Sequence, residues 1–302
     1  MRKQLCDALV ARSARPEMVF LTGDLGFMAL EPLQAALGPR FVNAGVAEQN
    51  MVSVAAGMAR QGLDTWVYSI APFCYARPFE QIRNDVAFHD LPVKLIGNGG
   101  GYGYGVMGPT HHAIEDYGVL LTLPHMRAYV PVFDEDIGAV IERAGAAAHP
   151  IYLRLGRGEP PKGYTVPPYA AWRQLVSGGG PVLIAVGPLA GTYIAAALDL
   201  PEAARPNLWA VAELPLEANP VPAALEAQVA ACEELHVAEE HVRRGSFGAE
   251  LALHLLERGH APKRFVHHPA RAHNFGRYGS QAYLRTCSGL DDATVLGSIE
   301  RH

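Results

Sequence analysis

The residue best placed for chemistry is Glu48. It follows a short apolar stretch, residues 41–43, which we expect to be a strand. It also begins the Ala- and Met-rich stretch 48–61, which we expect to be a helix that ends at Gly62. A glutamate at a helix start meets the helix dipole favourably, which is a purely structural reason for its presence. Because open α/β sheets bind ligands beyond the carboxyl ends of their strands, this carboxyl group is also placed to hold a ligand or a proton.

Two further stretches carry groups that could hold a ring or move a proton. Residues 68–87, YSIAPFCYARPFEQIRNDVA, contain Phe73, and an aromatic side chain can stack on a ligand ring and fix its orientation. Residues 107–118, MGPTHHAIEDYG, contain His111, whose imidazole can change charge near neutral pH. The structural alternatives are a core aromatic for Phe73 and a histidine bonded to backbone at a helix start for His111.

The stretch around Glu48 resembles a known family signature. Residues 45–59, GVAEQNMVSVAAGMA, are similar to the pyrimidine-binding domain of transketolases and related thiamine-diphosphate enzymes. In that family the glutamate matching Glu48 hydrogen-bonds N1′ of the aminopyrimidine ring. A shared proton there favours the imino tautomer, whose 4′-nitrogen can remove the thiazolium C2 proton. The resemblance therefore implies thiamine diphosphate as the cofactor and Glu48 as its activator.

The same resemblance implies further cofactor contacts. Phe73 matches the aromatic that stacks on the pyrimidine, and Val46 matches the apolar residue that keeps the cofactor in its bent V shape. Ala76 stands where the family often has a tyrosine, and Tyr75 could substitute for it. The cofactor-binding residues that we expect are Asp24, Leu25, Val46, Glu48, Phe73 and Tyr75.

Substrate contacts are implied in the same way. The GPTHH segment resembles a family segment in which a histidine faces the substrate, and the match is His111, as a hydrogen-bond donor or proton relay. Arg154, in the stretch YLRLGRGE with Arg157, matches an arginine that binds substrate phosphate. Arginine suits such contacts because its planar fork binds oxyanions bidentately, although an interdomain ion pair is the structural alternative.

The loop that precedes the GPTHH segment departs from the family. In residues 98–107, NGGGYGYGVM, Gly99 replaces a substrate-binding histidine and Met107 replaces an aspartate that reads a donor hydroxyl. Loss of these hydrogen bonds predicts an atypical donor, with Tyr102 and Met107 near a reshaped donor pocket. Residues 103–108 also match GxGxxG, but the loop is too long for the tight turn of a dinucleotide site.

The order of elements predicts an α/β fold. Apolar strand-like stretches at residues 18–22, 41–43, 66–70, 93–97, 127–132 and 151–155 alternate with helix-like stretches, notably 77–88 and 134–147. This rhythm predicts a mostly parallel sheet with helices on both faces.

The domain organisation follows from composition and from a second resemblance. We expect a thiamine-diphosphate pyrimidine-binding domain at 1–160, a Pro-rich linker at 161–178 and a smaller α/β domain at 179–302, again with a mostly parallel sheet flanked by helices. The stretch HVAEEHVRRGSFGAELA, from His236, resembles the C-terminal domain of transketolases, which serves chiefly in assembly. The neighbouring Glu239 and Glu240 are expected to be structural rather than metal ligands.

Composition excludes several classes of function. The chain has 302 residues, a formal net charge of −5 and scattered basic residues, so neither nucleic acid nor a membrane surface is an expected partner. Four cysteines without a CxxC pair argue against a disulfide framework or a zinc site. With no signal-peptide pattern and no membrane-spanning stretch, we expect a soluble, cytoplasmic protein.

One family feature is missing. The GDG segment followed by Asn, which in the family holds Mg²⁺ (or Ca²⁺) and the diphosphate, is not found, and we expect no metal ligands on this chain. We therefore expect an N-terminal transketolase-like partner subunit that carries the GDG…N domain. The expected assembly is an α₂β₂ heterotetramer with the cofactor at the subunit interface, and this chain alone is expected to be inactive.

The function expected from the resemblance is that of the C-terminal (β) subunit of a split transketolase. It would transfer a two-carbon ketol or acyl unit from a small sugar or keto donor to an aldehyde acceptor. The alternatives are a 2-oxo-acid dehydrogenase E1β subunit, against which the GPTHH segment argues, and a deoxyxylulose-phosphate-synthase-like subunit. A non-catalytic regulatory subunit is the alternative of another class; Glu48, Phe73 and His111 argue against it, but the loss of two donor-site groups leaves it open.

Overall fold

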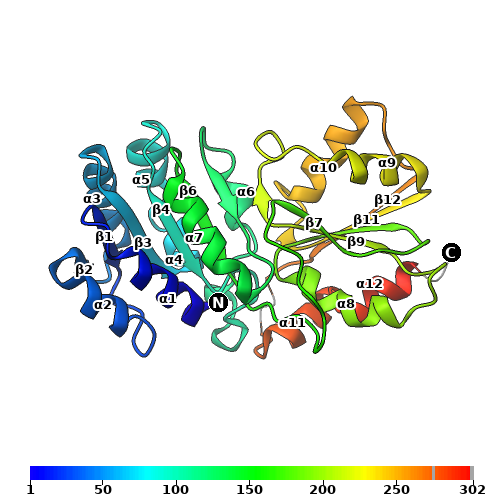
Figure 1. The fold of residues 1–302 in the computed structure, drawn as a ribbon, viewed down its shortest axis with the longest axis horizontal. Coiled ribbons are helices and arrows are strands. Elements are labelled where there is room, and N and C mark those ends of the chain that lie inside the picture. The colour runs from blue at the N-terminus through cyan, green and yellow to red at the C-terminus, as the bar shows by residue number, and fades with distance from the viewer. Residues whose placement is uncertain (274–275, 300–302) are drawn as a thin grey trace.

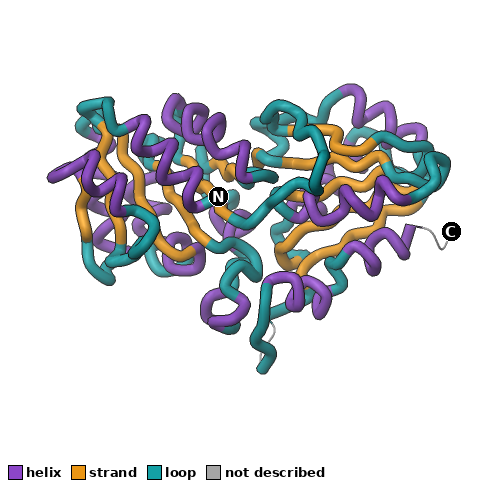
Figure 2. The backbone as a smooth tube through the Cα atoms, turned by 60° about the horizontal axis from the view of Figure 1, so that its bottom comes forward, coloured by secondary structure: helices purple, strands orange, loops and turns teal. Residues whose placement is uncertain are grey.

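Two α/β lobes lie side by side in the computed structural model, which describes residues 1–273 and 276–299 (Figure 1). The first lobe contains a seven-stranded sheet and the second a five-stranded sheet. Helices cover both faces of each sheet (Figure 2). The expected fold of two α/β domains, each with a mostly parallel sheet, is confirmed. Within the described residues, no helix combines the length and the apolar character needed to cross a membrane.

The sheet of the first lobe has the order β10-β5-β6-β4-β3-β1-β2 and is parallel except for β10. Its strands are β1 (Met18–Thr22), β2 (Phe41–Asn43), β3 (Asp64–Ile70), β4 (Lys94–Asn98), β5 (Arg127–Tyr129), β6 (Ile151–Leu155) and β10 (Glu213–Leu214). Its helices are α1 (Arg2–Arg12), α2 (Glu31–Leu37), α3 (Glu48–Arg60), α4 (Ala71–Tyr75), α5 (Phe79–Gln81), α6 (Asp116–Leu120) and α7 (Ile137–Ala146).

The strands of this sheet are apolar on both faces because both are covered. In β1 all five residues are buried. Phe20 packs in a cluster with side chains of α1, α2 and α7, whereas the next residue, Leu21, packs in the cluster that contains α3. This alternation follows from the period of two along a strand, and it explains why the sequence shows continuous apolar runs.

The parallel register brings three chain segments to one edge of the sheet. Thr22, at the end of β1, lies beside both Asn43 of β2 and Tyr68 of β3, and Ile70 of β3 lies beside Asn98 of β4. The segments that leave these strands lead to α3, α4 and the GPTHH loop, so the motifs found in the sequence leave the sheet at its carboxyl edge.

The helix expected at 77–88 begins two residues later, at Phe79, and changes to a π-helical turn after Gln81. Helix α4 ends at Tyr75, and Pro78 separates it from α5 and a π-helical turn at Ile82–Ala87. Proline lacks the N–H needed to continue a helix and restricts the residue before it, which accounts for the break. Ala76 and Arg77 therefore lie in a short connection between two helical segments.

The sheet of the second lobe has the order β12-β11-β8-β9-β7, with only β7 antiparallel. Its strands are β7 (Trp172–Val176), β8 (Val182–Val186), β9 (Asn207–Val211), β11 (Glu234–Val242) and β12 (Arg264–Ala270). Its helices are α8 (Leu189–Asp199), α9 (Ala223–Ala231), α10 (Phe247–Glu257), α11 (Gln281–Ser288) and α12 (Asp292–Ile299).

The boundary between the lobes differs in detail from the boundary expected from composition. The segment 161–178 contains strand β7, because Trp172 and Val176 are buried against the second sheet. In return, β10 crosses from the second part of the chain to pair with β5 of the first sheet. The two lobes are thus joined by the crossing strand β10 as well as by packing.

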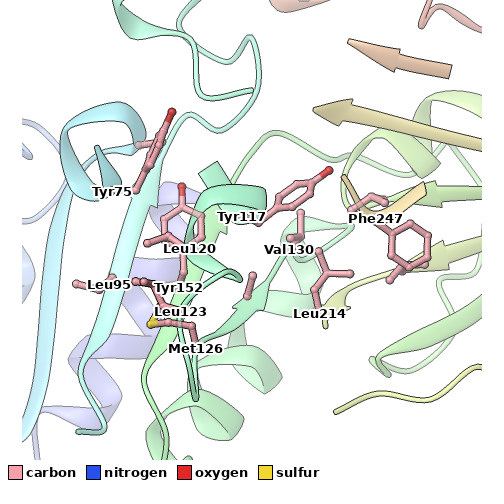
Figure 3. Close-up of a cluster of buried hydrophobic side chains, with 14 of the residues drawn as sticks. Tyr75, Leu95, Tyr117, Leu120, Leu123, Met126, Val130, Tyr152, Leu214 and Phe247 are labelled. Atoms are coloured by element: carbon pink, nitrogen blue, oxygen red, sulfur yellow. The ribbon is translucent and has the colours of Figure 1, made fainter. Parts of the chain in front are cut away.

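A continuous apolar cluster and a buried carboxylate join the lobes. Tyr117, Val130 and Leu214 belong to the same cluster as Phe247 of α10 (Figure 3). The phenolic hydroxyl of Tyr117 donates a hydrogen bond to Oε2 of Glu239 at 2.5 Å. The same carboxylate accepts hydrogen bonds from two N–H groups at the start of α10, so its charge compensates the helix dipole.

Glu240 makes a second link between the lobes. It is buried, and its carboxylate accepts hydrogen bonds from the Tyr102 backbone N–H in the first lobe and from Gln281 and Arg285 in the second. The Arg285 guanidinium lies 2.8 Å from Oε2 and holds the pKa of Glu240 below its usual value, against the opposing effect of burial. Both glutamates of the HVAEEH stretch therefore have structural partners in this chain.

Glu240→Gln should lower the free energy of unfolding by about 3 kcal/mol, because it leaves the Arg285 charge buried without its partner. Urea denaturation followed by circular dichroism measures the effect. Glu257→Gln, the same change at an exposed position of α10, is the matched control and should leave stability nearly unchanged. Equal stability of both variants would contradict the structural role of Glu240.

Candidate functional site

Glu48 is the first residue of α3 and is only 4% exposed. Its carboxylate lies between the ends of β1 and β3. A methyl group added to Gly23 would lie 3.6 Å from Oε1 of Glu48, and Ser69 Oγ lies 3.4 Å from the same oxygen. The expected placement of a carboxyl group beyond the carboxyl ends of the strands is what the structure shows.

Arg77 is the cation that faces Glu48. Its Nη1 donates to both carboxylate oxygens at 3.0 Å. Its guanidinium carbon also lies 3.9 Å from the centre of the Phe73 ring, within the range of a cation–π contact. Sequence reasoning missed Arg77 because an unbroken helix was expected from that residue onward. Helical spacing could not have found it, because Arg77 lies beyond the end of α4, in the connection to α5.

His111 joins the same group through Phe73. The two rings meet edge to face with centroids 5.2 Å apart, and the Tyr104 ring lies 6.4 Å from the imidazole on a similar geometry. His111 Nδ1 is 2.9 Å from the Thr110 hydroxyl. The structure therefore brings together the three residues that sequence reasoning ranked first, Glu48, Phe73 and His111, with Arg77 among them.

The other expected cofactor contacts are distributed around Glu48. Val46 is 73% exposed and precedes α3, where a bound molecule could cover it. Asp24 has a left-handed backbone (φ 57°). Two hydrogen bonds with the Asn43 side chain stabilise this conformation: the Asp24 backbone N–H donates to Oδ1 of Asn43, and the Asp24 carboxylate accepts from Nδ2 of Asn43. Leu25 lies next to it and is partly buried. All three are on the same edge of the sheet as Glu48.

Tyr75 has a different neighbour from the one expected. Its hydroxyl donates to Oε2 of Glu115 at 3.2 Å, and the other oxygen of Glu115 pairs with His273. Burial raises the pKa of the Tyr75 hydroxyl. The side chain thus belongs to a polar cluster with Glu115 and His273.

The glycine-rich loop is packed rather than open. Tyr102 is fully buried, and its hydroxyl bonds to the Ala272 carbonyl at 2.7 Å and to Ser288 at 2.8 Å, so it is a core residue between the lobes. Gly99 has φ 76°, and a side chain there would collide with the Tyr104 ring. A histidine at this position would therefore displace Tyr104. Met107 is 54% exposed and stays on the surface of the loop.

The two arginines of the YLRLGRGE stretch have opposite surroundings. Arg154 is buried, 2.8 Å from Asp116, and its Nη2 donates to the carbonyl oxygens of Ala113 and Glu240. Arg157 is exposed and lines a cavity of about 620 Å³ between the loop 98–106 and the start of α11. The ion pair of Arg154 therefore lies within the first lobe, and its contact with the second lobe is the hydrogen bond to the Glu240 carbonyl. Of the two arginines, Arg157 is the one that lines the cavity.

One group of described residues has metal-ligand character, and it lies away from this site. Asp90, His125 and His149 precede β4, β5 and β6 at the opposite, amino edge of the sheet, with Asp90 Oδ1 2.9 Å from His149 Nδ1. Mg²⁺ prefers all-oxygen coordination, so a set with two imidazoles does not suit it. This group and Glu48 lie at opposite edges of the sheet.

The fold and the site together define a class of protein. Beyond the carboxyl edge of a parallel sheet, a buried carboxylate lies next to an aromatic ring whose face is covered by the Arg77 guanidinium. The family model described as the transketolase pyrimidine-binding domain matches residues 7–162. The match covers more than half of the chain, and the protein therefore belongs to this family.

Individual relatives agree with this assignment. The chain is 33% identical over 165 residues to one subunit of the apulose-4-phosphate transketolase of Phocaeicola vulgatus, an alignment that covers 54% of this chain and 53% of that protein. It is 29% identical over 261 residues to the subunit of the same name from Actinobacillus succinogenes, covering 85% and 83% of the two chains. The first alignment thus spans about half of that relative.

A solved structure extends the similarity to both lobes. A split gene transketolase, described as an inactive β4 tetramer, superimposes with a TM-score of 0.83 and 27% identity over 99% of this chain and 96% of that chain. The chain thus corresponds to the C-terminal half of a split transketolase-like protein, as the resemblance in the sequence predicted.

His112 gives the site region a testable pH dependence. Burial, with a smaller contribution from His273, lowers the pKa of His112 from 6.5 to about 4. Below pH 6.5 the unfolded chain binds a proton that the folded chain does not, so stability is complete above that pH and falls as the pH is lowered towards 4.

The free energy of unfolding should fall between pH 7.5 and pH 5. In His112→Gln this fall should therefore be smaller by about 2 kcal/mol than in the parent chain. The measurement is the difference between urea unfolding free energies at the two pH values, which separates the proton effect from any packing change. His89→Gln, at an exposed histidine, should leave that difference unchanged. The prediction fails if both variants lose the same stability on acidification as the parent chain.

Proposed function

We propose that this chain is the subunit of a split, thiamine-diphosphate-dependent transketolase that activates the cofactor's aminopyrimidine ring. The observation that carries the proposal is the buried carboxylate of Glu48 beside the Phe73 ring, inside a domain of the pyrimidine-binding family. The enzyme would transfer a two-carbon ketol or acyl unit from a donor to an aldehyde acceptor.

The residues of the pocket suit the cofactor ring. A planar cation already stacks on Phe73 and bonds to Glu48, so a planar ring with a nitrogen at its edge can make the same two contacts. Phe73 and Val46 would hold the ring, and Glu48 would hold a proton at N1′. Thiamine diphosphate, when bound, supplies the carbanion chemistry of the reaction.

His111 is placed to act on the substrate. Its imidazole touches the edge of Phe73, on the same group of side chains as Glu48, and Thr110 orients its Nδ1. The ring can therefore donate a hydrogen bond to a donor oxygen or relay a proton. A histidine so placed supports a catalytic rather than a purely regulatory subunit.

Arg157 is the proposed anchor for an anionic substrate group. It lines the cavity together with Arg2, and these two arginines give that wall a positive charge; Tyr104 lies in the same lining. The two relatives named as parts of an apulose-4-phosphate transketolase support a phosphorylated sugar as substrate. Gly99, where a side chain would collide with the Tyr104 ring, and the apolar Met107 replace two polar donor-binding residues of the family. They support a donor different from that of an ordinary pentose-phosphate transketolase.

The proposal includes a partner. A second polypeptide with a diphosphate-binding GDG…N domain would bind Mg²⁺ and the diphosphate, with an α₂β₂ assembly and the cofactor between the subunits. The relative described as an inactive β4 tetramer supports the view that β subunits of this kind need a partner for activity.

Glu48→Gln should reduce turnover of the reconstituted complex by at least about 100-fold, because the amide cannot hold the proton that the carboxyl group holds at N1′. The assay contains this chain, its partner subunit, thiamine diphosphate and Mg²⁺. Circular dichroism of the variant tests that the fold is kept. Near-normal turnover by a folded Glu48→Gln variant would refute the proposed role of the carboxyl group.

Arg157→Ala should raise KM for a phosphorylated donor by about tenfold, the usual effect of losing a hydrogen bond to a charged group, with a smaller change in kcat. Steady-state kinetics of the reconstituted complex give both constants. Arg244→Ala, at an exposed arginine outside the cavity, is the control. An unchanged KM in the Arg157 variant would show that the substrate anion is bound elsewhere.

A further inference from the structure

Arg77 occupies the place and makes the contacts that the proposed function assigns to the aminopyrimidine ring. Its planar guanidinium lies 3.9 Å from the Phe73 ring centre and donates at 3.0 Å to both oxygens of Glu48. The aminopyrimidine is also planar and also needs the ring of Phe73 and the carboxyl group of Glu48. The two groups cannot make these contacts at the same time.

The charge of Glu48 explains why Arg77 occupies this position. The carboxylate is almost completely withdrawn from water, and its hydrogen-bond partners among the described residues are Arg77 and, at the long distance of 3.4 Å, Ser69. A buried carboxylate without a partner is strongly unfavourable. Until a ligand arrives, Arg77 provides the compensating charge.

The position of Arg77 also permits it to leave. The side chain is 45% exposed, so water already reaches it and can solvate the guanidinium once it moves. Its backbone lies in the short connection between α4 and α5, immediately before Pro78. A rotation of this side chain requires no break in a helix.

We infer that Arg77 is a displaceable substitute for the cofactor ring: it neutralises Glu48 and covers Phe73 in the free chain, and it must swing out before the aminopyrimidine can bind. This inference rests on the proposed function. It makes Arg77 a residue that sets cofactor affinity, because the apparent dissociation constant increases as the fraction of open pockets decreases. The pairing of Arg77 with Glu48 also helps to keep the isolated subunit folded before the cofactor binds.

The contact itself can be tested in the isolated chain by a double-mutant cycle. Arg77→Ala should lower the urea midpoint when Glu48 is present, and the effect should disappear in the Glu48→Gln background, where no buried charge needs a partner. Arg83→Ala, at an exposed arginine shortly after Arg77, should change the midpoint in neither background. Equal effects of Arg77→Ala in both backgrounds would show that the ion pair is absent.

Displacement is tested by cofactor binding to the reconstituted complex, with thiamine diphosphate and Mg²⁺ as the probe and titration calorimetry as the readout. Arg77→Ala should bind the cofactor about tenfold more tightly than the parent complex, since the competing contact is a partly exposed ion pair of modest strength. Arg77→Lys should be intermediate, because lysine keeps the charge but not the planar stacking. Arg83→Ala should match the parent.

The outcomes separate this inference from the proposed function. If Arg77→Ala binds the cofactor equally or more weakly while Glu48→Gln abolishes turnover, the inference is wrong and the proposed function stands. If Glu48→Gln retains turnover, the proposed function is wrong whatever the affinities. Arg77→Gln, which keeps polar contacts, replaces Arg77→Ala in both experiments if the alanine variant does not fold.

Discussion

A carboxylate removed from water must have a partner, and this requirement organises the molecule from the site to the lobe interface. Glu48 forms an ion pair with Arg77, Asp116 with Arg154, and Glu240 with Arg285. Each pair joins segments that are separated in the chain. Removing one partner leaves an uncompensated charge, which is why these pairs hold loops and lobes in defined positions although a buried ion pair adds little net stability by itself.

The same requirement separates Glu48, the proposed activating carboxyl group, from the structural ones. Glu239 and Glu240 have their oxygens surrounded by several donors, including backbone N–H groups and side chains of both lobes. Glu48 depends mainly on one half-exposed side chain. A carboxylate with a single, movable partner can exchange that partner for a ligand, whereas one inside a dense network cannot.

Both lobes line the cavity beside the glycine-rich loop. The glycine-rich loop is held by Glu240 through the Tyr102 backbone and by Tyr102 packing between the lobes. The loop in turn places Tyr104 near His111. The second lobe therefore helps to hold the loop whose Tyr104 lies near His111.

The sequence by itself determined the class of the molecule. Apolar periodicity identified the strands and helices of two α/β domains. The GVAEQN, YSIAPF and GPTHH stretches identified Glu48, Phe73 and His111, because these features depend on short stretches of neighbouring residues. Only the tertiary structure decided which charged groups are neighbours. It placed Arg77 on Glu48, Arg154 in the core, Arg157 at the cavity, Tyr102 between the lobes and Tyr75 on Glu115. The partner of a buried charge is set by long-range packing, and no local pattern of residues encodes it.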